Sequence, residues 1–137
     1  MKELGPYLNF NGNCSEAMNF YKECLGGDLT LMTFEDSKQD VPAVMKDQIM
    51  HSTLRFTPHA SVMASDCMPD QPAVNGTSIT ISVNCESEES INKFYAALAK
   101  GGKETMPLAD TFWGARFGML TDKFGMQWMF NFDKPKQ

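Results

Sequence analysis

Histidine, paired cysteine and positive charge are all scarce in this chain. Only two histidines occur among 137 residues, and none of the four cysteines forms a Cys-x-x-Cys pair. That spacing excludes a zinc ribbon and a thioredoxin-type redox site. Lysine and arginine total 12 against 17 acidic residues, which gives a net charge of −5. Because nonspecific binding to nucleic acid and to anionic membranes depends on basic surface, we expect neither as a partner.

Long apolar runs are missing as well. The chain has no stretch of about 18 apolar residues that could span a bilayer, and residues 1–11 lack the basic and apolar segments of a signal peptide. We therefore expect a cytoplasmic protein with reduced cysteines, among them Cys24 as a buried apolar residue. With 137 residues, 42% of them apolar, the chain fits a single domain over residues 1–137 that needs no metal or disulfide for stability.

Two amphipathic helices stand out in the apolar pattern. They cover residues 13–25 and 87–100, and in each the apolar side chains recur at the spacing of one helix face. The apolar stripes consist of Ala17, Phe20, Tyr21, Cys24 and Leu25 in the first helix, and of Ile91, Phe94, Tyr95, Leu98 and Ala99 in the second. Every member of the second stripe follows its counterpart by 74 residues, which indicates an internal repeat.

The ends of both helices carry capping signals. Asn13 is predicted to cap the first helix with Glu16 as its capping-box partner, and Ser87 is predicted to cap the second. A Gly-Gly pair follows each helix, at 26–27 and at 101–102, and favours its termination.

Each helix is preceded by one predicted strand and followed by three. The alternating segments lie at residues 7–10, 28–34, 51–56 and 61–66, and then at 78–83, 103–107, 115–121 and 126–132. The fold class is therefore α+β, with two β-α-β-β-β modules at about 1–66 and 77–137 and a linker at about 67–76. The residues predicted to face the helices in the last strand are Trp128, Phe130 and Phe132. Residues 35–48 are predicted to form a long, mobile loop.

Several short motifs carry a resemblance to a known family. They are Pro6–Cys14 (PYLNFNGNC), Ile49–His51 (IMH), Thr111–Gly114 (TFWG) and, most specific of all, Thr121–Met129 (TDKFGMQWM). Together they span nearly the whole chain, and they resemble the PhnB-like branch of the glyoxalase/bleomycin-resistance/extradiol dioxygenase (vicinal oxygen chelate) superfamily. The resemblance implies that the modules form a curled mixed sheet and that the protein is a homodimer. It leaves the activity open, because a fold does not fix function.

The resemblance also implies where a metal would bind. Metal-using relatives place His or Glu on the concave face, on the first and last strands of each module. Carried over to this chain, these positions are Gly5, Met63, Ser78 and Met129, and their neighbours are Pro6, Ala64, Ile79 and Phe130. None offers the carboxylate or imidazole that a divalent ion prefers. Thioether sulfur suits Cu(I), but Met63 and Met129 are more typical of packing residues. We therefore expect no metal site and no cofactor.

Strand alternation predicts which residues line the concave face. The candidates for binding a small molecule are Tyr7, Asn9, His51, Arg55, Met63, Phe112, Trp113, Arg116, Gln127 and Met129, with Thr53, Ser65, Thr80, Ser82 and Asn131 beside them. Aromatic walls with a few polar groups are typical of a small-molecule pocket, and an arginine can hold an anionic group. Two alternatives stay open: Phe112 and Trp113 also suit a dimer contact or the core, and Arg55 and Arg116 also suit structural ion pairs.

His51 is the candidate catalytic residue. It is predicted to point into the concave face, where it could act as a general base with Asp66 or Asp110. It could equally serve as a hydrogen-bonded lining residue, whereas His59 is predicted to be solvated.

Three functions remain open from the sequence. The first is a PhnB-like small-molecule-binding protein without the superfamily metal. The second is a superfamily enzyme (a lyase, isomerase or oxygenase) with an unplaced metal or with His51 as base, and the third is a structural or interaction role. A methyltransferase activity, sometimes assigned to chains of this type, is not supported, because no glycine-rich strand-to-helix loop is present to hold its cofactor.

Overall fold

The computed structural model describes residues 1–136 and divides into two compact units. The first is Met1–Val74 and the second begins at Asn75. The boundary falls inside the predicted linker, and each unit contains one predicted module.

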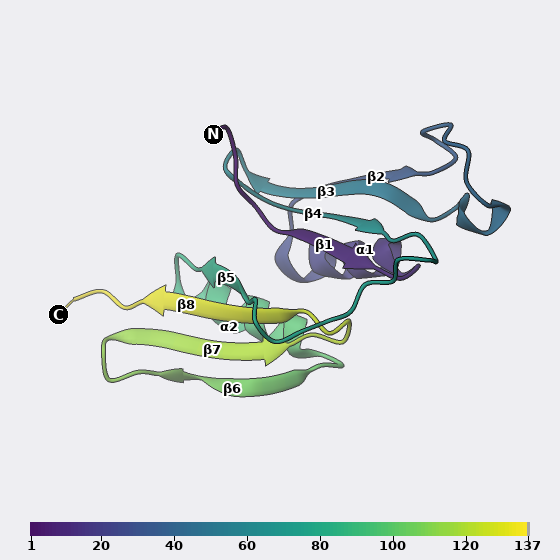
Figure 1. The fold of residues 1–137 in the computed structure, drawn as a ribbon. Coiled ribbons are helices and arrows are strands. Elements are labelled where there is room, and N and C mark those ends of the chain that lie inside the picture. The colour runs from purple at the N-terminus through teal and green to yellow at the C-terminus, as the bar shows by residue number, and fades with distance from the viewer. Residues whose placement is uncertain (137) are drawn as a thin grey trace. The chain divides into compact units, whose positions relative to one another are not determined.

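Each unit is a four-stranded mixed sheet with one α-helix against it (Figure 1). The first unit contains β1 (Tyr7–Phe10), α1 (Cys14–Leu25), β2 (Asp28–Thr33), the short 3-10 helix η1 (Ala43–Met45), β3 (Ile49–Thr57) and β4 (Ala60–Asp66). The second contains β5 (Ile81–Asn84), α2 (Glu88–Ala99), β6 (Lys103–Asp110), β7 (Ala115–Thr121) and β8 (Gln127–Asp133). This order confirms the predicted α+β fold with two β-α-β-β-β modules.

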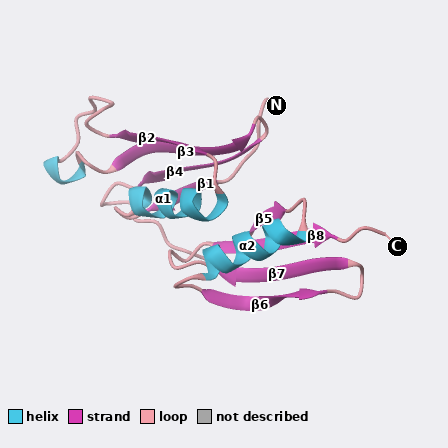
Figure 2. Ribbon diagram, turned by 180° about the vertical axis from the view of Figure 1, so that it is seen from behind, coloured by secondary structure: helices cyan, strands magenta, loops and turns pink. Residues whose placement is uncertain are grey.

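The two sheets have the same topology. Their strand orders are β1-β4-β3-β2 and β5-β8-β7-β6. In each, the strand that precedes the helix pairs in parallel with the last strand, and the other pairs are antiparallel. Figure 2, seen from behind, shows α1 and α2 each lying across one face of its own sheet. Within its own unit, and among residues 1–136, the other face of each sheet carries no α-helix.

The core of each unit lies between its helix and its sheet. In the first unit the buried side chains of α1 are Cys14, Ala17, Met18, Tyr21 and Cys24, and those of the sheet include Leu8, Phe10, Leu54, Val62 and Ala64. In the second unit the buried residues are Ile91, Tyr95 and Leu98 of α2 with Leu120, Trp128 and Phe130 of the sheet. The helical and strand periods of the sequence thus predicted the core well, although Phe132 is only half-buried.

Two strand boundaries and one predicted cap differ from the structure. The strand predicted at 103–107 continues to Asp110. The strand predicted at 78–83 begins only at Ile81, since the Nε2 of Gln127 donates to the carbonyl of Ile79 at 2.9 Å. Ile79, an apolar residue of the predicted strand, lies outside β5 and is 79% exposed. The side chain of Asn13 makes no capping hydrogen bond to α1.

The predicted loop at 35–48 is partly organised. Its base continues the β2–β3 pairing, because the backbone N–H of Phe34 donates to Gln48 and that of Glu35 donates to Lys46. Within it, η1 buries Met45, which is 1% exposed. No helix among residues 1–136 is both long and apolar enough to cross a membrane.

Candidate functional site

The face of the first sheet that lies opposite α1 brings several predicted site residues into one array. Side chains alternate along a strand, so the burial of Leu8, Val62 and Leu54 beneath α1 puts their neighbours on the open face. Cross-strand pairing aligns Tyr7 with Met63 and Met63 with Thr53. The next residues on this face are Asn9, Ser65 and His51 toward one end, and Ser61 and Arg55 toward the other.

His51 is held between two hydroxyl groups on this face. Its Nδ1 lies 3.2 Å from the Tyr7 hydroxyl and its Nε2 lies 3.2 Å from the Thr53 hydroxyl. The Tyr7 and His51 rings are tilted by 38° with their centroids 5.8 Å apart. A neutral imidazole has one donor and one acceptor nitrogen, so one hydroxyl donates to the ring and the other accepts from it. This arrangement fixes the ring orientation and leaves a half-buried imidazole that can take or give a proton.

Asp66, one of the two predicted acid–base partners of His51, has a different role. Its Oδ1 accepts the backbone N–H groups of Gly12 and Cys14 at 2.9 and 3.0 Å, and its Oδ2 accepts that of Ile49 at 2.9 Å. The side chain is buried on the α1 side of β4. It therefore caps α1 in place of Asn13, and the predicted pairing with His51 is wrong.

Asp110, the other predicted partner, belongs to an exposed ion-pair cluster of the second unit. Its carboxylate lies 2.8 Å from Lys134 Nζ and 3.2 Å from Arg116 Nη1. The hydrogen bonds from Lys134 and from Arg116 hold the pKa of Asp110 below its usual range. Arg116 Nε also donates to Asn92 of α2 at 2.8 Å, so Arg116 points to the helix side of its sheet. Of the two roles left open for Arg116, the structure favours the structural ion pair.

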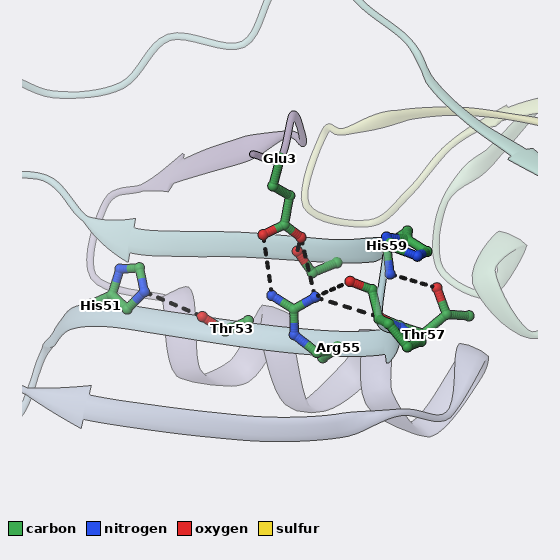
Figure 3. Close-up of polar contacts among 8 residues, drawn as sticks. Glu3, His51, Thr53, Arg55, Thr57 and His59 are labelled. Atoms are coloured by element: carbon green, nitrogen blue, oxygen red, sulfur yellow. Dashed lines mark hydrogen bonds and ion pairs between the residues drawn. The ribbon is translucent and has the colours of Figure 1, made fainter. Parts of the chain in front are cut away.

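Arg55 lies on the open face of the first sheet and is paired with Glu3 (Figure 3). The guanidinium hydrogen bond and charge hold the pKa of the Glu3 carboxyl below its usual range. His59, in the turn between β3 and β4, is exposed as predicted. Glu3 was not a predicted site residue, because it precedes the first strand and has no place in the alternating pattern. Its hydrogen-bonding partner Ser61 was missed, although strand alternation puts it on the same face as Met63.

The predicted site residues of the second unit are divided between anchoring and exposed positions. Gln127 is occupied with the segment before β5, since its Nε2 also lies 3.4 Å from the Gly76 carbonyl. Met129 lies on the face of β8 away from α2, paired with Ser82 and Met119. Asn131, on the same face, donates to Asn84 at 3.3 Å.

Phe112 and Trp113 lie in the turn between β6 and β7. They are 98% and 59% exposed, with their rings edge to face at 5.1 Å. Their predicted alternative as core residues of this chain is therefore wrong. A ligand contact and a dimer contact both remain open.

Burial disfavours the thiolate form of Cys14 and Cys85. Burial raises the pKa of the Cys14 thiol to about 12 and raises that of Cys85 above its ordinary value. Cys24 is buried as predicted. Because the thiolate is the nucleophilic form, burial argues against nucleophilic catalysis by Cys14.

The residues at the superfamily's metal positions do not fit a divalent ion. The observed register places Tyr7 beside Met63 and Ser82 beside Met129, so Gly5 and Ser78 lie ahead of their strands. The four predicted positions thus offer two thioethers, one hydroxyl and, at Gly5, no side chain, and the strand neighbours Tyr7 and Ser82 add a phenol and a second hydroxyl. All of these are poor ligands for Zn²⁺, Fe²⁺ or Mn²⁺. Within residues 1–136, no three His, Cys, Asp or Glu side chains gather in a way that could hold a metal.

Comparison with known proteins gives matches over nearly the full chain. Residues 4–130 match the Glyoxalase/Bleomycin resistance protein/Dioxygenase superfamily. Protein YjdN of Escherichia coli K12 is 34% identical, with 93% of each chain covered. The crystal structure of PA1353 from Pseudomonas aeruginosa is 42% identical and covers 97% of this chain and 98% of its own, with a TM-score of 0.86. A Bacillus cereus PhnB protein, described as a putative 3-demethylubiquinone-9 3-methyltransferase, is 25% identical over 94% and 98% of the two chains, with a TM-score of 0.73.

Proposed function

Since this chain belongs to the Glyoxalase/Bleomycin resistance protein/Dioxygenase superfamily and is similar to a PhnB protein, we propose that it is a PhnB-like small-molecule-binding protein that works without the superfamily metal. The ligand binds on the open face of the first sheet, over Tyr7, Thr53 and Met63. The observation that carries this proposal is His51, whose two ring nitrogens both lie against hydroxyl groups on that face. A polar group held in a fixed orientation among aromatic and thioether side chains is what orients a ligand in a pocket.

The proposal includes the absence of a metal because of the side chains at and beside the positions where metal-using relatives hold their ion. Tyr7 with Met63, and Ser82 with Met129, supply no carboxylate or imidazole. A methyltransferase activity, as in the description of the Bacillus cereus protein, is not proposed, because the chain lacks a glycine-rich loop for a nucleotide-like cofactor. A homodimer, common among superfamily members, completes the proposal.

An enzyme with His51 as general base is the second candidate, and the same contacts favour it. An imidazole held by Tyr7 and Thr53 could accept a proton from a ligand and pass one to the phenol. In the part of the chain that the structure describes, both ring nitrogens face hydroxyl groups, and Asp66 is bound to backbone N–H groups on the other side of the sheet. Binding therefore remains the first proposal.

The test is a thermal-shift screen of chelator-treated protein against a set of neutral and anionic organic compounds. A ligand that binds the folded state at a hundredfold excess over its dissociation constant adds about 2.7 kcal/mol to the free energy of unfolding. We expect compounds that shift the wild type and His59→Ala but not His51→Ala, with Tyr7→Phe intermediate. His59→Ala is the matched control, because it removes the chain's other histidine from an exposed turn.

Three results would revise the proposal. Hits that survive His51→Ala place the binding site elsewhere. Conversion of a hit by the wild type but not by His51→Ala, followed by mass spectrometry, moves the enzyme to first place. A saturable shift with one of Zn²⁺, Ni²⁺, Mn²⁺ or Fe²⁺ contradicts the metal-free part.

A further inference from the structure

The Glu3 carboxylate makes a two-point contact with Arg55. Arg55 Nη1 lies 3.1 Å from Glu3 Oε1 and Nη2 lies 3.4 Å from Oε2, while the Ser61 hydroxyl donates to Oε1 at 3.4 Å (Figure 3). Two guanidinium nitrogens facing two carboxylate oxygens form the geometry by which arginine recognises a carboxylate. One buried hydroxyl adds a third donor.

Both donor residues are also anchored by contacts that do not involve Glu3. Arg55 Nη1 also donates to the backbone carbonyls of Thr57 and Pro58, at 3.4 and 3.3 Å, where the chain turns from β3 toward β4. Ser61 is 8% exposed and paired with Arg55 in the sheet. The positions of the guanidinium and of the hydroxyl are therefore set in part by the sheet and the β3–β4 turn.

The segment that carries Glu3 is, in contrast, largely exposed. Its backbone hydrogen bond to the sheet runs from the N–H of Met63 to the carbonyl of Pro6. Residues 1–6 form no helix or strand, and Met1 and Leu4 are 107% and 83% exposed. The side chains of Arg55 and Glu3 are themselves 41% and 35% exposed. Because exposed ion pairs contribute little to stability, a second carboxylate can replace Glu3 at small cost.

We propose that Arg55 and Ser61 form a carboxylate-binding subsite, that Glu3 occupies it in the free protein, and that a carboxylate-bearing ligand displaces Glu3. The side chains next to the subsite indicate the chemistry of the part of the ligand beyond its carboxylate. This inference rests on the proposed function. The next cross-strand row is Tyr7, Met63 and Thr53, and His51 lies four residues from Arg55, about 13 Å along an extended strand. The ligand class is thus a monocarboxylate with an apolar or aromatic body that covers Met63 and reaches His51.

The experiment is an NMR titration with 3-phenylpropionate and with its neutral amide, 3-phenylpropionamide. Four proteins are compared: the wild type, Glu3→Gln, Asp28→Asn and Arg55→Gln. Asp28→Asn is the matched control. Asp28 is an exposed carboxylate paired across the sheet with Arg55, so its replacement removes the same charge without opening the subsite. Circular dichroism and thermal unfolding check that each variant is folded.

We expect Glu3→Gln to bind the acid about three- to fivefold more tightly than the wild type, as suits release of an exposed ion pair, with the amide unchanged. Asp28→Asn should give a smaller gain, and Arg55→Gln should bind acid and amide alike. In the wild type, the pKa of Glu3 should rise toward its ordinary value as the acid saturates, because its guanidinium partner is taken. Equal gains in Glu3→Gln and Asp28→Asn, or an acid preference that survives Arg55→Gln, would overturn the subsite.

The signals that move distinguish this subsite from the proposed function. Acid and amide that bind equally and shift only Tyr7 and His51 would leave the proposed function standing and overturn the subsite. An acid that shifts the NMR signals of Arg55 and Ser61 but not those of His51 would support the subsite. It would contradict the inference that the ligand body extends from the subsite to His51. Failure of every protein to bind the acid would overturn the subsite, whatever the neutral compounds do at His51.

Discussion

Single polar side chains satisfy backbone groups that the helices and strands leave open. Asp66 accepts N–H groups from the start of α1 and from Ile49. Asp122, buried in the β7–β8 turn, accepts those of Phe124 and Met126 and also the indole N–H of Trp128 at 2.8 Å. Each carboxylate accepts hydrogen bonds from backbone N–H groups next to the core. Buried N–H groups that are left unpaired lower the stability of the folded state. These acids are therefore structural, although their residue type alone would equally suit catalysis.

Tyr95 has the corresponding role in the β6–β7 ladder. Its hydroxyl lies 3.0 Å from the carbonyls of both Met106 and Met119, where the register of the two strands is irregular. Gly118 permits this contact, since a Cβ there would lie 2.8 Å from the Tyr95 ring. Burial, with a smaller effect from Glu104, raises the pKa of Tyr95 to about 12.

Replacement of Tyr95 by Phe should lower the free energy of unfolding by about 1–3 kcal/mol at neutral pH, because the two carbonyls lose their donor. The raised pKa means that the folded state prefers the neutral phenol. The contribution is therefore complete below pH 10 and is lost as pH rises through about 12. Urea unfolding of both proteins between pH 7 and pH 12 should show the difference shrinking over that interval.

Tyr7→Phe is the control for that prediction. It removes the same atom from a side chain that is 43% exposed, so it should change stability by a few tenths of a kcal/mol. A difference between wild type and Tyr95→Phe that stays constant up to pH 12 would contradict the role assigned to the buried hydroxyl.

At the scale of elements, the two helices begin in different ways despite their repeated sequence pattern. The Ser87 hydroxyl accepts the N–H of Ser90 at 3.0 Å, and the Ser90 hydroxyl lies 3.3 Å from the N–H of Ser87, which completes a capping box. Ser87 was predicted as the cap and is confirmed, whereas α1 is capped from β4 by Asp66. A capping residue precedes each helix in the sequence, so the sequence predicted the same kind of cap for both. The two caps differ because β4 places Asp66 at the start of α1.

Ser87→Ala should therefore cost about 1 kcal/mol, the usual effect of losing a capping hydroxyl. Asn13→Ala is the matched control and should cost only a few tenths of that, since its side chain makes no cap hydrogen bond. Urea unfolding measures both losses. If the dependence of the unfolding free energy on urea concentration is the same in all proteins, a shift of the unfolding midpoint reports a change in stability alone. Equal losses in the two variants would show that Asn13 caps α1 after all.

The glycine pairs after the helices also do more than terminate them. A Cβ at Gly27 would lie 2.9 Å from the Arg55 carbonyl, and a Cβ at Gly102 would collide with the Thr121 carbonyl. The second glycine of each pair therefore lets the chain pass close to a neighbouring strand. That requirement comes from the sheet, and the helix pattern alone does not reveal it.

At the scale of the whole molecule, the exposed Phe112–Trp113 pair is the feature that most needs a partner. Exposed apolar clusters on soluble proteins are typical of binding surfaces. A ligand contact and a homodimer contact were both open from the sequence. Both residues are exposed, which is compatible with either.

We expect size-exclusion chromatography with light scattering to give twice the chain mass of 15.3 kDa. If the aromatic pair forms the dimer contact, the double variant Phe112→Ser/Trp113→Ser should run as a monomer, because the interface loses its largest apolar groups. Val44→Ser is the control, since Val44 is 74% exposed in another part of the chain. A wild type that runs as a monomer would contradict the dimer in the proposed function. A double variant that stays dimeric would show that Phe112 and Trp113 do not hold the dimer together, and would favour their role as a ligand contact.

The sequence by itself determined the order of elements, the helix faces and the family. Helical and strand periods are local, so they predicted α1, α2 and all eight strands to within a few residues at each end, and they placed Trp128 and Phe130 in the core. Alternation also predicted that His51, Thr53 and Arg55 share one face of β3.

Only the tertiary structure decided what those side chains contact. Asp66 meets Cys14 across 52 residues of sequence, and Arg55 meets Glu3 across the same separation. Arg116 turns to Asn92 of α2, and Gln127 is taken up by the chain before β5. Hydrogen bonds between distant segments depend on how the sheets bring strands together, and no local period encodes that. The sequence could therefore predict the face on which a site would lie, while the fold determined which of its groups are left to bind a ligand.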